Sequence, residues 1–244
     1  CAKSATVLLS GSGRVLGVSA FAPACRAGCG AGTMRCLSRT IPVFRCHRRI
    51  ISGIIGPQGK RNKTEQKDFD KDTKIYIHDA VRFSYKVFAC IDAYQKTKPD
   101  MLWYLDADII TFEKIPMSWL EHIVPDKSFT SYLGRPKKGF SETGYYAFNT
   151  AHKYAKEFFE RWQTYYDNDR FLELKGYTDS FTFDGARLEL EREGKIKNED
   201  LNDGRWAGGR RSRHPFINSE LGQYMDHLKG YHRKAQMTSK KREL

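Results

Sequence analysis

An apolar run that ends in two closely spaced acids constrains the fold of this chain more than any other feature. Residues 103–110 have the sequence WYLDADII. Side chains alternate along an extended strand, so we expect Asp106 and Asp108 on one face, with Leu105 and Ala107 turned into the protein. Two carboxylates this close repel each other unless one is protonated or a cation lies between them. The motif therefore predicts a strand that ends at a divalent metal site, where the ion acts as a Lewis acid toward phosphate oxygens.

Strand and helix patterns alternate on both sides of this motif. This alternation predicts an α/β fold with a mostly parallel, Rossmann-like central sheet flanked by helices, and ligands bound beyond the carboxyl ends of the strands. The expected strands are residues 74–78, the 103–108 segment, 128–133 and 145–149. The expected helices are residues 81–95, a short one at 119–123 after Pro116, a long one after Asn149 with an aromatic stripe, and one capped by Asp179 or Ser180 that ends near Gly194. Residues 195–213 are polar and rich in Gly and Arg, which predicts a loop.

The first 60 residues differ in composition from the rest. They hold nine Lys or Arg, no Asp or Glu, and five of the six cysteines. They show no sustained strand or helix period, so we expect an irregular extension, which is either an Arg-rich transit segment or a non-native start. Residues 61–72 are predicted to be a linker, 73–235 a folded domain and 236–244 a basic tail.

The charge and the cysteines exclude several classes of protein. The extension accounts for nine of the 13 net positive charges, which leaves +4 for the remaining 184 residues. No zinc finger, basic zipper or aromatic RNA-binding signature is present, so nucleic acid is not an expected partner. The cysteine spacings lack a Cys-x-x-Cys pair and therefore disfavour zinc. No run of 18 uncharged apolar residues predicts a membrane-spanning helix, so a cytoplasmic or membrane-peripheral location is favoured. The C-terminal KREL differs from an ER-retention signal and is interpreted as coincidence.

The ordered series of motifs around Asp106 and Asp108 resembles glycosyltransferases of the type A fold, over residues 73–235. In that family a strand ending in Asp-x-Asp holds a divalent metal against the diphosphate of a nucleotide sugar. The series comprises Arg82-Phe83-Ser84-Tyr85-Lys86, the Asp-x-Asp strand, Gly134-Arg135, Ser141-Glu142-Thr143-Gly144-Tyr145, Tyr177-Thr178-Asp179-Ser180 and His227-Leu228-Lys229-Gly230.

The resemblance implies a metal site with three ligands. Asp108 is the principal ligand, and Asp106 contacts the metal or the donor ribose. His227 is the third ligand, with His232 as its competitor, and the ion is Mn²⁺ or Mg²⁺. The segment of Lys229, Gly230 and Lys234 is expected to close over the diphosphate.

The resemblance also implies roles around the donor and the acceptor. Arg82 and Lys86 meet the nucleotide or its phosphates, unless they form a solvated helix face. Glu142 binds acceptor hydroxyls, unless it makes only a local turn contact, while Gly144 lets a substrate approach the backbone.

Asp179 is the candidate general base for an inverting transferase, with Asp184 as the alternative base. Asp179 is equally suited to capping a helix, and a retaining enzyme needs no such base.

The predicted function is metal-dependent transfer of a sugar from a nucleotide-diphosphate donor, UDP-linked as a first guess, to the hydroxyl of a glycan or other acceptor. Type A enzymes carry a nucleotide-binding strand ahead of the matching region, and residues 1–60 show no such strand, which predicts an incomplete donor pocket. One alternative is a phosphatase resembling the haloacid dehalogenase class, with Asp106 as nucleophile, although Ile110 stands where that class has Thr or Val. The other is a catalytically inactive carbohydrate-binding relative.

Overall fold

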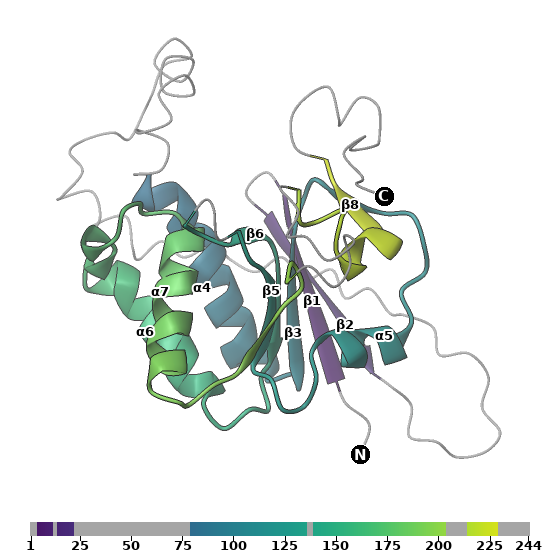
Figure 1. The fold of residues 1–244 in the computed structure, drawn as a ribbon, viewed down its shortest axis with the longest axis horizontal. Coiled ribbons are helices and arrows are strands. Elements are labelled where there is room, and N and C mark those ends of the chain that lie inside the picture. The colour runs from purple at the N-terminus through teal and green to yellow at the C-terminus, as the bar shows by residue number, and fades with distance from the viewer. Residues whose placement is uncertain (1–3, 12–13, 22–78, 136–138, 204–213, 229–244) are drawn as a thin grey trace, which may run out of the picture.

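A six-stranded sheet forms the centre of the molecule in the computed structural model, which describes residues 4–11, 14–21, 79–135, 139–203 and 214–228. The strand order is β2-β1-β3-β6-β5-β7 (Figure 1). The pairs β1/β3 and β5/β7 are parallel, whereas β1/β2, β3/β6 and β5/β6 are antiparallel. The predicted α/β class is therefore confirmed, but the sheet is mixed where a mostly parallel one was expected. Its strands are β1 (Ser4–Gly11), β2 (Arg14–Phe21), β3 (Met101–Asp106), β5 (Thr130–Leu133), β6 (Glu142–Asn149) and β7 (Asn198–Asp200).

Three helices cover one face of this sheet (Figure 1): α4 (Ala80–Thr97), α6 (Ala155–Asp167) and α7 (Asp179–Arg192). Leu102 and Tyr104 of β3 pack into this helical layer, together with aromatic side chains of β6 and α6. The neighbouring residues Met101, Trp103 and Leu105 belong to a second apolar cluster on the other face. The alternation of β3 side chains between two buried faces explains why its sequence is a continuous apolar run.

The second apolar cluster is covered by short elements. These are α5 (Met117–Ile123), the 3₁₀ turn η2 (Glu220–Gln223) and a two-stranded ribbon of β4 (Ile109–Thr111) with β8 (Met225–His227). Another 3₁₀ turn, η1 (Arg170–Glu173), follows α6. Among the described residues, no helix combines the length and the apolar character that crossing a membrane requires.

Most of the elements expected between residues 81 and 194 are present. Two boundaries differ: α7 has Thr178 as its N-cap, in place of the predicted Asp179 or Ser180, and the predicted loop 195–213 contains the short edge strand β7. The expected strand at residues 74–78 lies outside the described residues.

The N-terminal segment holds two strands where no regular structure was expected. β1 pairs in parallel with β3 over the register Ala5↔Met101 to Ser10↔Asp106, and β2 pairs with β1 along its full length. The expectation of irregular structure is therefore wrong for residues 4–11 and 14–21. β1 gains strand hydrogen bonds from β3, a partner that is distant in sequence and that local periodicity does not report, and β2 pairs with the adjacent β1.

Candidate metal site

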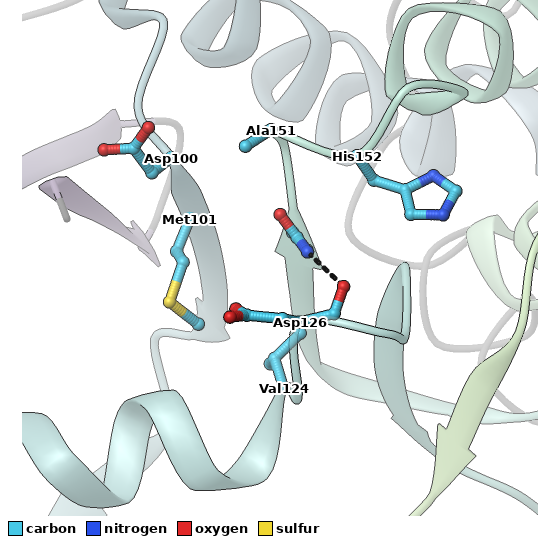
Figure 2. A pocket seen from close by; sticks show the side chains of 7 residues that line it. Asp100, Met101, Val124, Asp126, Ala151 and His152 are labelled. Carbon is cyan, nitrogen blue, oxygen red and sulfur yellow. Dashed lines mark hydrogen bonds between the residues drawn. The ribbon is translucent and has the colours of Figure 1, made fainter. Parts of the chain in front are cut away.

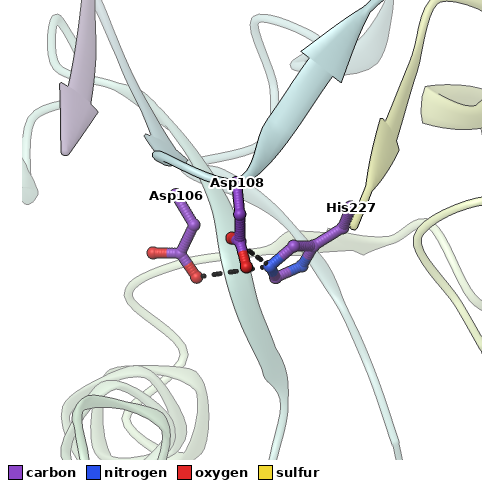
Figure 3. Close-up of side chains that lie close together, drawn as sticks. All are labelled: Asp106, Asp108 and His227. Carbon is purple, nitrogen blue, oxygen red and sulfur yellow. Dashed lines mark hydrogen bonds and ion pairs between the residues drawn. The ribbon is translucent and has the colours of Figure 1, made fainter. Parts of the chain in front are cut away.

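The ends of β3 and β8 bring two carboxylates and one imidazole together (Figure 3). β3 ends at Asp106, a turn at residues 107–108 follows, and β4 then pairs antiparallel with β8 in the register Ile109↔His227. The Leu228 amide donates to the Asp108 carbonyl oxygen at 2.9 Å, which extends this pairing to the turn. The two acids thus approach each other through the turn, and not through the strand alternation that the sequence suggested.

The imidazole of His227 lies at the centre of this group. Its Nε2 atom is 2.9 Å from Asp108 Oδ1 and 3.7 Å from Asp106 Oδ2. His227 is buried, while both carboxylates are partly exposed to solvent. All three residues come from elements that the sheet and the β4–β8 ribbon hold in place.

The donor set fits a divalent cation. Two ligands that each lie about 2.1 Å from one ion are no more than about 4.2 Å apart, and both His227 to carboxylate distances satisfy this limit. Carboxylate oxygens and an imidazole nitrogen are both ligand types that divalent cations accept in proteins. Within the described part of the chain, Asp106, Asp108 and His227 therefore form a candidate metal site, as the sequence predicted.

Lys86 connects this site to the helical layer. Its Nζ atom reaches from α4 to within 3.0 Å of both Asp106 Oδ1 and Asp179 Oδ2, and it donates to the Thr143 carbonyl oxygen at 2.6 Å. Burial on its own would lower the pKa of Lys86, but the two carboxylates, Asp179 first, raise that pKa well above its ordinary value. A charged Lys86 therefore lies between the candidate metal site and a buried acid.

Asp179 lies at the start of α7 and is 2% exposed. Besides Lys86, its carboxylate accepts a hydrogen bond from the Tyr146 hydroxyl at 2.8 Å. Burial, followed by the charge of Asp179, raises the pKa of Tyr146 well above its ordinary value, so Tyr146 acts here as a donor. These contacts explain why Asp179 does not cap its own helix.

Glu142 opens β6 and faces the ring of His227 from the side opposite Asp108. Its Oε1 atom is 3.6 Å from His227 Nδ1, and its Oε2 atom is 2.9 Å from Arg135 Nη1. Gly144 is close to the same ring, because a Cβ at this position would lie 2.4 Å from Nδ1. The space at Gly144 is thus filled by His227, and not left for a substrate as the sequence had suggested.

The other predicted residues make different contacts or fall outside the part of the chain that the structure describes. Arg82 is exposed in the first turn of α4, where its amide donates to Asp79. Asp184, the alternative base, accepts from both the amide and the hydroxyl of Ser141 and pairs with Arg187 at 2.9 Å. The remaining four lie outside the described residues: Lys229, Gly230, His232 and Lys234.

Several residues of the site were not predicted. Tyr104 donates to Asp106 Oδ1 at 3.1 Å. It precedes Asp106 by two residues on the same strand, so the alternation of strand side chains could have predicted this contact. Tyr146 contacts Asp179 from β6, and Arg135 contacts Glu142 from the segment after β5. Nothing local in the sequence indicates those contacts.

A separate hollow lies at the opposite end of β3 (Figure 2). It has a volume of about 270 Å³, and its lining includes Asp100, Asp126 and His152. The Asn149 side chain donates to the Asp126 carbonyl oxygen at 3.3 Å along its wall. Among the described residues, those that line this hollow include none of the predicted site residues, so it is distinct from the candidate metal site.

Comparison with known proteins adds one structural likeness. No protein-family model matches this sequence, and no curated protein matches it. Among solved structures, the crystal structure of a glycosyltransferase involved in the glycosylation of the major capsid of PBCV-1 is 12% identical, with 65% of this chain and 77% of that chain covered and a TM-score of 0.43. The described residues define an α/β protein with a candidate divalent-metal site.

Proposed function

We propose that this protein is a metal-dependent glycosyltransferase that moves a sugar from a nucleotide-diphosphate donor to an acceptor hydroxyl. The observation that carries the proposal is the convergence of Asp106, Asp108 and His227 at the end of a central strand. The ordered motifs of residues 82–230 support the same class. The location beyond the carboxyl end of β3 is where ligands bind in open α/β sheets.

The protein side chains have separate tasks in this proposal. Asp106, Asp108 and His227 would hold the ion, and Lys86 fixes Asp106 from α4 through the 3.0 Å ion pair. A bound divalent cation supplies positive charge that offsets the charge developing on a departing diphosphate. Lys86 also contacts Asp179 at 3.0 Å, so the predicted general base is linked electrostatically to the metal ligands. The general-base role of Asp179 and the UDP nature of the donor stay predictions.

The test is release of nucleoside diphosphate from a panel of nucleotide sugars in the presence of Mn²⁺. We expect turnover that chelation abolishes, and a loss of about 100-fold or more in Asp108→Asn, since that variant removes a charged ligand of the cation that offsets the charge on the departing diphosphate. Glu189→Gln is the matched control, because Glu189 is a partly buried carboxylate of α7 paired with Arg170.

The rival functions give different results in the same assay. Phosphate released from phosphomonoesters with the nucleotide sugars untouched would support the phosphatase. Binding of carbohydrate without turnover of any donor would support the non-catalytic module. Full activity in Asp108→Asn would contradict the metal site itself.

A further inference from the structure

The ring of His227 faces a carboxylate on each side. Its Nε2 atom is 2.9 Å from Asp108 Oδ1, and its Nδ1 atom is 3.6 Å from Glu142 Oε1. A single imidazole nitrogen can ligate a metal while the other is oriented by a protein group. Glu142 thus lies on the Nδ1 side of the candidate ligand, whereas Asp108 lies on its Nε2 side.

Glu142 is itself held by the protein. Its side chain is 6% exposed, and Arg135 Nη1 lies 2.9 Å from Oε2. The Gly144 amide donates to Oε1 at 3.3 Å, while a second nitrogen of Arg135 donates to the Ser141 carbonyl oxygen at 3.1 Å. These contacts fix the carboxylate from two sides. They leave Oε1 directed toward His227.

The ring of His227 has little freedom to turn away from Glu142. On one side Gly144 permits a contact that any Cβ would block at 2.4 Å. Phe216 packs edge-on to the ring at a centroid distance of 5.4 Å. His227 is 5% exposed, so its orientation is set by these neighbours and not by solvent.

From this geometry we propose that Glu142 is a positioning residue for His227, in place of the acceptor-binding role that the sequence suggested. In this role the Glu142 carboxylate, 3.6 Å from Nδ1 and therefore beyond hydrogen-bond distance, acts on that side of the ring through its charge and favours the orientation that directs Nε2 toward Asp106 and Asp108. Carboxylates that orient a ligating histidine raise metal affinity about 10- to 100-fold. The proposal rests on the proposed function only in requiring that Asp106, Asp108 and His227 bind a metal.

The test is a double-mutant cycle on Mn²⁺ affinity, measured by isothermal titration calorimetry on the full chain without any nucleotide sugar. We expect Glu142→Gln to weaken Mn²⁺ binding about 10-fold or more. In the background of His227→Ala, the same Glu142 substitution should change the affinity less than about twofold, because its effect passes through the missing ring. A purely structural role for Glu142 would not produce this coupling.

Two further variants keep the test decisive. Glu142→Asp keeps the charge opposite Arg135 but withdraws it from the ring, so it should also weaken Mn²⁺ binding, and it replaces Glu142→Gln if that variant does not fold. Glu189→Gln removes a comparable carboxylate from the Arg170 pair and should leave the affinity unchanged.

The outcomes separate the two proposals. Equal losses from the Glu142 substitution with and without His227 would overturn the positioning role and leave the metal site standing. Unchanged affinity in both Glu142 variants would do the same. No Mn²⁺ binding by the unmodified chain would overturn both proposals.

Discussion

At the residue scale, the side chain of Lys86 on α4 links three other elements of the molecule. It connects Asp106 on β3, Asp179 on α7 and the Thr143 carbonyl on β6, and its ammonium lies 4.8 Å from the centre of the Tyr104 ring. The shared cation compensates the buried Asp179 for its lost hydration and lets the partly exposed Asp106 lie nearby.

Replacement of Lys86 should therefore cost stability through Asp179. We expect Lys86→Met to lower the free energy of unfolding by about 3–5 kcal/mol, because it leaves a carboxylate that is 3% exposed without its cation. The double variant Lys86→Met/Asp179→Asn should lose less than Lys86→Met alone, since the uncompensated charge is then gone. Urea unfolding of the parent, Lys86→Met, Asp179→Asn and the double variant measures this, and a double variant whose loss equals the sum of the two single losses would refute the coupling.

At the element scale, the β4–β8 ribbon is the device that completes the candidate metal site. It carries His227 to the turn that holds Asp108, although the two residues are 119 positions apart in the sequence. The bond from the Leu228 amide to the Asp108 carbonyl oxygen lies at the end of the ribbon nearest the site. The geometry of the ligands therefore depends on backbone pairing.

Two substitutions of Leu228 separate this backbone bond from packing. Leu228 is 3% exposed, so Leu228→Ala should destabilise the fold by about 2–4 kcal/mol while Mn²⁺ affinity is retained. Leu228→Pro also removes the amide donor. Its Mn²⁺ affinity should be at least about 10-fold lower than that of Leu228→Ala, because the turn and β8 are no longer joined at that point. Calorimetry on both folded variants provides the comparison, and equal affinities would show that the bond does not set the ligand geometry.

The elements that were predicted correctly are those with a strong local signal. The aromatic stripe of α6 and the apolar positions of α4 and α7 repeat at helical spacing, and the buried run of β3 is continuous. The short strands β7 and β8 lack such a signal, since each has only three residues and is defined by its hydrogen bonds to the strand beside it.

The difference between local and long-range signals also explains which contacts of the candidate site could be predicted from the sequence. Asp106, Asp108 and His227 were grouped through the order of the motifs, and the structure brings them together. The contact of Glu142 with His227 and that of Lys86 with Asp179 join residues whose proximity is created only by packing. Local sequence carries no information on such long-range pairs, so Glu142 and Asp179 were assigned roles from the resemblance alone.

At the scale of the whole molecule, the two faces of the sheet are covered by different structural elements. One face packs against α4, α6 and α7 in an aromatic core, and an ion-pair cluster on the outside of α6 and α7 joins Arg161 to Glu157, Glu189 and Glu193. The other face carries the β4–β8 ribbon that positions His227. Stability in acid and metal affinity should therefore respond to different residues.

Arg161 offers the test of this separation. Hydrogen bonds from Arg161 and Lys195 lower the pKa of Glu193 from its ordinary 4.5 to about 2, and the pKa of Glu157 is lowered by Lys195 and Arg161. A carboxylate whose pKa is lower in the folded state stabilises that state above its unfolded pKa, so this contribution is complete above about pH 5 and is lost as the pH falls toward 2. Arg161→Met should consequently have a lower Tm than the parent at pH 7, by an amount that shrinks below pH 4.5.

Thermal unfolding between pH 7 and pH 2.5 measures this gap, and the exposed Arg192 of the same helical layer provides the control, since Arg192→Met removes an equal charge without entering the cluster. The paired side chains are partly exposed to solvent, so the gap should be modest and should narrow with added salt. Mn²⁺ affinity at pH 7 should be the same in Arg161→Met and the parent, because the cluster lies on the helices and the candidate ligands lie on β3, the turn that follows it and β8. A Tm difference that stays constant down to pH 2.5 would show that Arg161 acts through packing of its side chain, whereas a parallel loss of Mn²⁺ affinity would show that the two faces of the sheet are coupled.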